Sequence, residues 1–490
     1  MKHKIILFFI ILILIFINLF SCNADTTDKN QKNDADNNEN AGSADQTQSD
    51  EPEDMFATIG ERDFGGYEFT FLTLEAGIND TNRFVQEIMV EEETGDTIDD
   101  AIFRRNSMLF DRYNVKIKTV PSMNPDGDAR KTIKAGDDIY DMVNLYKGSA
   151  MALASEGLFK NFHDLQNVDF SAPWWSARCA AGLAVQGRLY NMSGSILISE
   201  IDDTLAMIFN KKLAENYEVE NLYSLVKQGE WTLDKMSKIV KNISSDLNGD
   251  GAYKPKDDLF GYIQDPASMT FNWVFSSDLL RGYIDGDGKY EPNADIARCQ
   301  SLVDMLYDLF VDKQSAYTGL DLYEGLKYFE DNRIFLYAII LRNIELLRGM
   351  DVDFGVLPYP KLDENQKSYL THVGGASPIM CIPITNGENN RTGYVLEAMS
   401  IASYNIAVPA YYDIALKTKY SRDDDSSEML DIILESRMYD ISYYAGNSLI
   451  SMIAPMITKV EHNFASVYEK QSANIFKNLQ KIIDKLINID

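Results

Sequence analysis

The sequence YEFTFLT at residues 67–73 decides the fold class together with VKIKTV at residues 115–120. Both alternate apolar with polar side chains and are rich in β-branched and aromatic residues, which predicts two strands. Between them, residues 97–113 carry apolar side chains at helical spacing, which predicts an amphipathic helix. A third strand is expected at residues 139–145. Strands that alternate with helices in this way indicate an α/β domain with a largely parallel sheet.

The same kind of pattern continues along the rest of the chain. An apolar helix is expected at residues 301–311, and from residue 392 onward the chain is predicted to be helical to its end. The last helix carries a single apolar stripe that includes Leu479 and Ile483. Four further apolar runs predict strands, at residues 205–209, 335–341, 354–357 and 378–382.

The composition excludes one class of partner. The chain of 490 residues has 75 acidic and 46 basic side chains, a formal net charge of −29. Docking on nucleic acid or on acidic lipid needs a basic face, so neither is expected to be a partner. Hydrophobic residues make up 45% of the sequence, which is enough for the large core of two or three domains.

The N-terminus has the pattern of an export signal. A positively charged start at residues 2–4 precedes an apolar run that is too short to span a bilayer, and Ser21-Cys22 follow. Residues 1–22 resemble a bacterial lipoprotein signal, which implies cleavage before Cys22 and lipid on that cysteine. The bulky Phe20 departs from the usual pattern, so an uncleaved signal anchor is the alternative. Either interpretation places the rest of the chain outside the cytoplasm, at a membrane.

Residues 23–55 are expected to form a disordered tether. They are almost all polar or acidic, so they cannot bury enough apolar surface to offset the entropy of ordering. A flexible stalk of roughly 30 residues reaches about 30 Å. The three remaining cysteines, Cys179, Cys299 and Cys381, are odd in number and widely spaced, so we expect small buried apolar residues instead of a disulfide framework.

The loop at residues 246–257 has the spacing of a calcium site. Oxygen-bearing side chains stand at its first, third, fifth and twelfth positions, and Gly251 stands at the sixth, as in an EF-hand. This spacing predicts a structural calcium ion, with a solvated Asx turn as the alternative because Asp257 is shorter than the usual glutamate. No other cofactor is expected. The predicted metal ligands are Asp246, Asn248, Asp250 and Asp257.

Catalytic signatures are missing from the sequence. It has no His-Glu-x-x-His and no Gly-x-Ser-x-Gly motif, and its four histidines are scattered. The aromatic residues offer a better indication of function, because an exposed indole face stacks on a sugar ring while polar neighbours bind its hydroxyls. Tryptophan is also a common core residue, and Trp231 is expected to be structural because it precedes a predicted helix at Thr232.

Three segments resemble extracellular solute-binding proteins of ABC importers, in the sugar-binding group that includes maltose-binding protein. They are IFNKKL at residues 208–213, GEWTLDK at residues 229–235 and DFGVLPYP at residues 353–360. Their order and spacing match across residues 65–490. The resemblance implies an α/β, two-lobed periplasmic-binding-protein-like (type II) fold with a hinge and a ligand cleft.

By position, the resemblance divides the chain into two lobes. Lobe one would comprise residues 56–200 plus 332–400, and lobe two residues 201–331 plus 401–490. Ligand binding closes such a protein only through contacts from both lobes, so the expected ligand residues come from both. The three crossings between lobes are expected near residues 195–204, 331–341 and 390–404. The predicted ligand residues are Tyr146, Trp174, Trp175, Asp202, Asp203, Trp273, His372 and Tyr443.

The resemblance implies a monomeric, lipid-anchored binding protein that captures a carbohydrate and delivers it to an ABC permease. No catalytic residue is predicted. One alternative is a surface hydrolase that uses a carboxylate pair on glycans. Another keeps the fold and changes the role, to a ligand sensor or a carrier of peptides or other solutes.

Overall fold

The computed structural model describes most of the chain after the expected tether. The signal segment at residues 1–22, including Cys22, and the tether up to residue 53 lie outside the described residues. Among the described residues, no helix is both long enough and apolar enough to cross a membrane. The described ranges are 54–75, 82–265, 268–280, 282–311, 313–347, 349–351, 353–375, 377–412 and 424–489.

The first sheet contains the strands that begin the globular part. Its order is β12-β3-β1-β2, and β1 runs parallel to both β2 and β3, with Tyr67 opposite Val115. The predicted strands near residues 67, 115 and 139 are thereby confirmed. Strand β12 pairs antiparallel with β3 from far along the chain. The bounds are β1 (Tyr67–Leu74), β2 (Val115–Ser122), β3 (Met142–Tyr146) and β12 (Pro378–Cys381).

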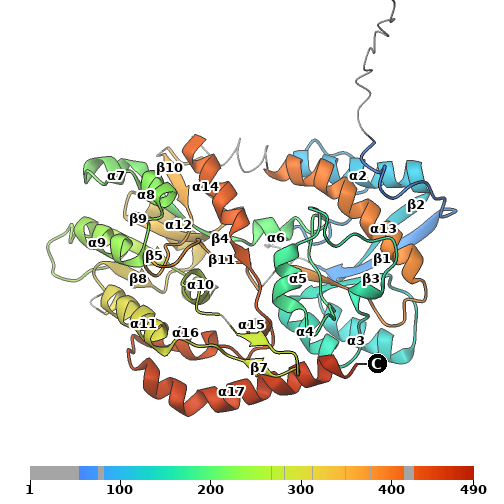
Figure 1. Ribbon diagram of the computed structural model, residues 1–490. Helices are drawn as coiled ribbons and strands as arrows, with labels where there is room; N and C mark the ends of the chain where they lie inside the picture. The colour runs from blue at the N-terminus through green and yellow to red at the C-terminus, as the bar shows by residue number, and fades with distance from the viewer. Residues whose placement is uncertain are drawn as a thin grey trace, which may run out of the picture. The chain divides into compact units, whose positions relative to one another are not determined.

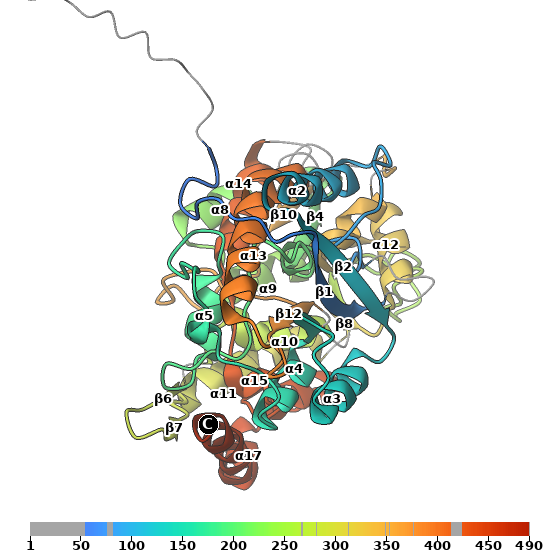
Figure 2. The ribbon, with the colours of Figure 1, turned by 90° about the vertical axis from the view of Figure 1, so that its right-hand side faces the viewer.

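Local signals set the helix between the first two strands. Helix α2 (Thr97–Tyr113) begins where the Asp96 side chain accepts the N–H groups of Ile98 and Asp99, and it ends at Asn114 in the left-handed conformation. This confirms the helix predicted at residues 97–113. Figure 2 shows α2 and α13 beside each other, near β1 and β2. The other helices of this part are α3 (Pro125–Ala135), α4 (Lys147–Ser155), α5 (Ala177–Leu183) and α13 (Asn389–Ala402).

The second sheet is mixed and is buried on both faces. Its order is β10-β4-β9-β5-β8, with β5 parallel to β8 and β9 and the other pairs antiparallel. Along β4, Leu205 and Met207 pack into one apolar core while Ala206 and Ile208 pack into another. Burial on both faces explains why this strand is apolar throughout. The bounds are β4 (Leu205–Asn210), β5 (Phe260–Gln264), β8 (Ala316–Thr318), β9 (Ile334–Ile340) and β10 (Phe354–Leu357).

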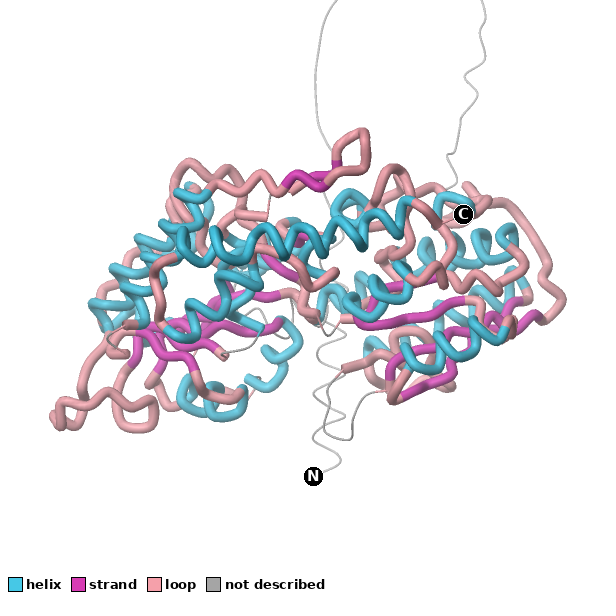
Figure 3. The backbone as a smooth tube through the Cα atoms, turned by 90° about the horizontal axis from the view of Figure 1, so that it is seen from below, coloured by secondary structure: helices cyan, strands magenta, loops and turns pink. Residues whose placement is uncertain are grey.

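Helices surround the second sheet, as Figures 1 and 3 show. We call the apolar core around the first sheet the first core, and the core that contains Leu205 and Met207 the second core. The last helix, α17 (Phe464–Ile487), contacts both, since Phe464 packs in the second core and Leu479 and Ile483 pack in the first. Other helices of the described chain are α7 (Lys211–Asn216), α8 (Leu222–Gln228), α9 (Leu233–Ile243), α10 (Ser268–Ser276), α11 (Ile296–Phe310), α12 (Leu322–Glu330), α14 (Asp424–Glu435), α15 (Ile441–Tyr444) and α16 (Ile450–Lys459).

Two predictions about the core are confirmed. Trp231 is 0% exposed, its indole N–H donates to the carbonyl of Pro358 (2.9 Å), and Thr232 caps α9. All three cysteines of the described chain are free and buried. Burial raises the pKa of each of these thiols, so they remain protonated.

The expected lobe boundaries need correction. Strands β9 and β10 were expected in lobe one with residues 332–400, and a crossing was expected near 331–341, but both strands pair in the second sheet. Apolar strands of this kind fit either sheet, because pairing depends on contacts distant in sequence. The chain returns to the first sheet only at β12. In the range 401–490, assigned to lobe two, Tyr439 and Ile441 pack in the first core.

The expectation of helix from residue 392 to the end also needs a correction. A short strand, β13 (Arg437–Met438), interrupts the helices and pairs with β11 (Thr371–His372). The first predicted crossing agrees with the structure, since the chain leaves the first core at Leu197 and enters the second at Leu205 through the short helix α6 (Ser199–Asp202).

Candidate ligand-binding cleft

Three segments of the chain lie side by side where the two cores meet, and we call them the crossing segments. The first is residues 198–205, the second residues 371–375 with Ser377, and the third residues 437–446. Thr204 bridges to Val373, and the N–H of Gly374 donates to the carbonyl of Asp203 (2.8 Å). The pairing of β11 with β13 adds the third segment. The crossing segments therefore hydrogen-bond to one another through the backbone.

A cavity of about 600 Å³, the first cavity, opens between the end of β3 and the crossing segments. Tyr146 ends β3, and Gly148 and Ser149 follow in the first turn of α4. The carboxyl ends of parallel strands are the usual place for ligands in α/β folds. The lining residues are Tyr146, Gly148, Ser149, Gly375, Tyr443, Tyr444 and Gly446.

A second cavity, of about 400 Å³, adjoins the first and shares Tyr443 and Gly446 with it. Its other walls come from α10 and α16, which belong to the second core. We call the two cavities together the cleft, which is lined from both cores. The lining residues of the second cavity are Thr270, Phe271, Tyr443, Gly446, Ser448, Ile450, Ser451, Ala454, Pro455 and Thr458.

The described lining of the cleft carries no Asp, Glu, Lys, Arg or His side chain. It offers instead aromatic rings and hydroxyl groups. Burial raises the pKa of Tyr443 to about 12 and that of Tyr444 well above its ordinary value, so both hydroxyls keep their protons at neutral pH. The Tyr444 hydroxyl is buried and has no hydrogen-bond partner among the described residues. Buried polar groups usually have a partner, so this hydroxyl is a candidate donor to a polar ligand.

An aromatic cluster supports the tyrosine that the two cavities share. The ring of His372 stacks on Phe275, with centroids 4.4 Å apart and planes 7° apart, and meets Tyr443 edge-on at 4.9 Å. Burial lowers the pKa of His372 well below its ordinary value, so the imidazole is neutral. The predicted ligand residue His372 is thus placed behind Tyr443 and is absent from the described lining of the cleft.

The two predicted aspartates are bound within the protein. Asp203 is fully buried and forms an ion pair with Arg342. Asp202 accepts the hydroxyl of Tyr411, and burial raises the pKa of this carboxyl to about 6. Both lie in the first crossing segment, as predicted, but neither lines the cleft.

The predicted tryptophans lie elsewhere. The indole N–H groups of Trp174 and Trp175 both donate to the Glu397 carboxylate, at 3.1 and 2.8 Å. Both rings line a separate pocket of about 210 Å³, together with Tyr404. Trp273 is 0% exposed in the second core, so the expectation that it contacts a ligand is corrected: its ring has no open face.

Of the predicted ligand residues, the structure brings Tyr146 and Tyr443 together in the first cavity, and their contact with a ligand stays a prediction. Several lining residues were not predicted, including Ser149, Phe271 and Tyr444. Tyr444 directly follows the predicted Tyr443, and Ser149 lies three residues after the predicted Tyr146, so extending each candidate by a few residues would have found them. Phe271 lies two residues before the predicted Trp273, so the same extension includes it, but which of the two lines the cleft depends on how α10 packs.

The predicted calcium loop is closed by its own backbone. The Asp246 carboxylate accepts the N–H groups of Gly249 (2.7 Å) and Gly251 (2.8 Å), and the Asp257 carboxylate lies 3.9 Å from the Lys256 ammonium. No cluster of three metal-ligating His, Cys, Asp or Glu side chains occurs among the described residues. This arrangement is the Asx turn considered as the alternative. A calcium ion on these residues stays a prediction.

Comparison with known proteins identifies the fold. No protein-family model and no curated protein matches the chain. The GacH receptor of Streptomyces glaucescens is similar in structure, with 14% identity, a TM-score of 0.52 and coverage of 86% of this chain and 99% of that chain. The galacto-N-biose/lacto-N-biose I-binding protein of the ABC transporter from Bifidobacterium longum is also similar, with 12% identity and a TM-score of 0.53. The match covers 87% of this chain and 98% of that chain.

A third similar structure is the cyclic α-maltosyl-1,6-maltose binding protein from Arthrobacter globiformis, with 13% identity, a TM-score of 0.53 and coverage of 87% of this chain and 100% of that chain. At such identities the likeness establishes the fold alone. The chain has the two-lobed, periplasmic-binding-protein-like α/β fold, which confirms the predicted fold class. Each sheet with its helices corresponds to one lobe.

Proposed function

We propose that this protein captures a neutral carbohydrate, an oligosaccharide, in the cleft and delivers it to an ABC permease without changing it. The observation that carries this proposal is the cleft lining. Tyrosine and phenylalanine rings can stack on the apolar faces of sugar rings, and serine, threonine and tyrosine hydroxyls can bind their hydroxyl groups. A charged solute would need an ionic partner, and the described lining offers none.

The origin of the lining residues supports capture by closure. Tyr146 and Ser149 follow a strand of the first sheet, whereas Phe271 and Ser451 stand on helices of the second core. A ligand that contacts both lobes favours the closed state by its differential affinity for that state. The two lobes with a lined cleft between them provide this geometry.

The ligands of similar structures agree with a carbohydrate. The GacH receptor was solved with acarbose, and the Bifidobacterium protein with lacto-N-biose. A further similar structure, a cyclo/maltodextrin-binding protein with a TM-score of 0.52 and 14% identity, was solved with maltotetraose. These ligands are all oligosaccharides, or their close analogues, and they define the first panel to test.

A binding role also fits the chemistry of the cleft better than hydrolysis does. Most glycosidases need two carboxyl groups beside the bond that breaks. The described lining of the cleft contains none. We therefore favour binding over the alternative of a surface hydrolase.

The position of the protein at the outer face of the cell membrane is part of the proposal. It is supported by the sequence of residues 1–22, with lipid on Cys22, and by the polar composition of the following tether. A lipid anchor and a flexible tether would keep the lobes near a permease. Mass spectrometry of the exported protein tests the anchor, with a diacylated Cys22 at the new N-terminus as the expected result.

Isothermal titration tests the binding function directly. The globular chain is titrated with acarbose, maltotetraose and lacto-N-biose, and the solutions are then analysed for cleavage products. We expect saturable binding of at least one neutral oligosaccharide and no products. Tyr443→Ala should weaken that binding about tenfold or more, which is about 1.4 kcal/mol. The matched control is Tyr323→Ala, an exposed tyrosine on α12. Cleavage of a sugar would contradict the proposal.

A further inference from the structure

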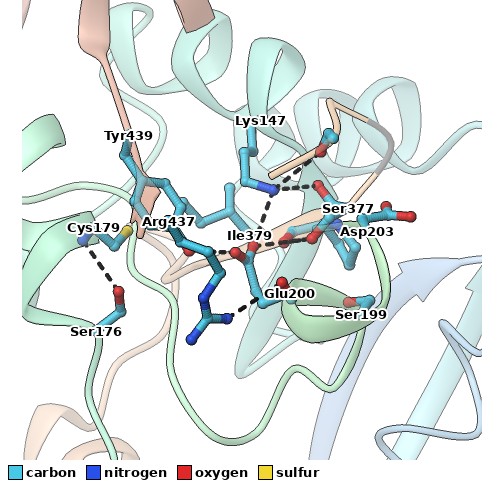
Figure 4. A network of polar contacts seen from close by, with 12 residues as sticks. Lys147, Ser176, Cys179, Ser199, Glu200, Asp203, Ser377, Ile379, Arg437 and Tyr439 are labelled. Atoms are coloured by element: carbon cyan, nitrogen blue, oxygen red, sulfur yellow. Dashed lines mark hydrogen bonds and ion pairs between the residues drawn. The ribbon is translucent and has the colours of Figure 1, made fainter. Parts of the chain in front are cut away.

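A buried ion pair lies where the first lobe meets the crossing segments. The Lys147 ammonium is 3.0 Å from the Glu200 carboxylate, and each residue is only 2% exposed (Figure 4). Lys147 begins α4 of the first lobe, and Glu200 lies in α6 of the first crossing segment. Burying two charges is costly unless they are paired and hydrogen-bonded, so this pair constrains the groups around it.

The Glu200 carboxylate also binds the other two crossing segments. The Ser377 hydroxyl of the second segment donates to Glu200 Oε1 (3.0 Å), and the Tyr439 hydroxyl of the third segment donates to Oε2. The Glu200 carbonyl accepts the Arg437 guanidinium at 3.3 Å. Figure 4 shows these groups converging on Glu200. One side chain thus joins α4 and all three crossing segments.

The Lys147 ammonium completes the network from the other side. It donates to the backbone carbonyls of Ser377 (3.1 Å) and Gly374 (3.5 Å), and it lies 6.0 Å from the centre of the Tyr444 ring. With the Glu200 carboxylate, the ammonium therefore has three oxygen atoms within 3.5 Å. Both charged residues are buried.

Three partners in this network adjoin or form the lining of the first cavity, whereas Glu200, Arg437 and Tyr439 line the pocket of Trp174 and Trp175. Lys147 stands between Tyr146 and Gly148, and Gly374 precedes Gly375. Tyr444 itself lines the cavity. The network is thus placed to set the positions of the cavity walls, although neither charged side chain is part of the described lining of that cavity.

We propose that Glu200 is the positioning residue of the cleft: through Lys147, Ser377 and Tyr439 it holds the cavity walls from the first lobe and the crossing segments in one arrangement. Its consequence for ligand affinity rests on the proposed function, whereas its effect on the order of the walls does not. Removing the carboxylate charge leaves a buried ammonium without its counter-ion, so the three attached segments should loosen together.

Hydrogen–deuterium exchange of the full globular chain tests this proposal without a ligand. In Glu200→Gln we expect about tenfold or more faster exchange in residues 144–150, 371–375 and 437–446 together. The matched control is Glu397→Gln, which alters another buried carboxylate with two side-chain donors, outside the cleft. It should leave exchange in these three ranges unchanged. Wild-type exchange in all three ranges of Glu200→Gln would overturn the proposal.

A double variant separates positioning from general stability, and it also serves if Glu200→Gln fails to fold. Lys147→Met with Glu200→Met removes both charges, and replacing a buried pair by apolar side chains of similar volume keeps a protein stable. We expect near-normal global stability but fast exchange in residues 371–375 and 437–446, because the hydroxyls of Ser377 and Tyr439 lose their acceptor. Normal exchange there would show that the pair is only structural.

A separate ligand-binding experiment tests the proposed function. Wild type and Glu200→Gln are titrated with maltotetraose and lacto-N-biose, and about tenfold weaker binding is expected for the variant. If wild type binds neither sugar, the proposed ligand is contradicted. The hydrogen–deuterium exchange result still tests the positioning role of Glu200. If wild type binds and the variant binds equally well, the positioning role of Glu200 is contradicted.

Discussion

The protein has two pairs of aromatic residues that are neighbours in sequence, and their surroundings differ. The pair Trp174–Trp175 is the more obvious sugar-binding candidate by residue type, but both indole N–H groups are bound to Glu397. The pair Tyr443–Tyr444 lines the cleft, and the buried Tyr444 hydroxyl has no partner within the described part of the chain. On the proposed function, polar atoms without a partner beside an open ring indicate an aromatic binding site better than ring size does.

The largest expected effect concerns the tryptophan pair. Glu397→Ala leaves two indole donors without an acceptor and opens space beside them, so we expect the free energy of unfolding to fall by about 3 kcal/mol. Ligand affinity should change less than twofold, because these rings lie outside the cleft. Urea unfolding and calorimetric titration measure the two quantities. A loss of affinity comparable with that of Tyr443→Ala would reverse the comparison.

A second buried carboxylate gives a pH-dependent effect. Burial raises the pKa of Glu87 from 4.5 to about 8, although the N–H and hydroxyl of Ser199 bind it and Arg105 lies nearby. A raised carboxyl pKa means that the folded state takes up a proton between pH 4.5 and 8. The Glu87 contribution to stability is therefore complete below pH 4.5 and is lost as pH rises towards 8.

Glu87→Gln isolates this contribution. The difference between wild type and variant in free energy of unfolding should fall by up to about 1.4 kcal/mol per pH unit between pH 5 and 8. The other charges near Glu87, those of Glu200 and Asp202, are common to both proteins. Urea unfolding at four pH values provides the measurement. Parallel curves for the two proteins would show that the Glu87 carboxyl titrates normally.

Removing the hydroxyl of Tyr444 should have a smaller effect, which is unfavourable for ligand affinity but not for stability. Tyr444→Phe removes a buried donor that has no partner among the residues the structure describes, so stability should stay the same or rise by about 1 kcal/mol. Affinity should fall about tenfold if a ligand accepts this hydrogen bond. The control is Tyr394→Phe, whose hydroxyl donates to the Gly60 carbonyl; there stability should fall and affinity should not change. Equal behaviour of the two variants would contradict the role of Tyr444.

The smallest expected effect is the pH dependence of affinity. The described lining of the cleft has no group that titrates between pH 5.5 and 8, since tyrosine is its only ionisable residue type and the pKa of Tyr443 is raised to about 12. Binding of a neutral sugar should therefore vary less than threefold over this range. Titrations at three pH values check this, and a steep change would indicate a charged ligand.

The sequence predicted those features that depend on neighbours along the chain. The helix at residues 97–113 follows from the Asp96 cap and the periodic apolar residues, and Tyr146 was found because it ends a predicted strand. The features that it did not predict depend on distant contacts. The sheet to which β9 belongs, the burial of Trp273 and the binding of two indoles by Glu397 each depend on residues distant in sequence.

The central claim is that the tyrosine-lined cleft, and not the tryptophan pocket, holds a neutral sugar. A crystal structure with the best-binding oligosaccharide tests this claim most directly. We expect sugar rings against Tyr146 and Tyr443 and a hydroxyl of the sugar bound to Tyr444. A ligand bound beside Trp174 with the cleft empty would contradict the claim.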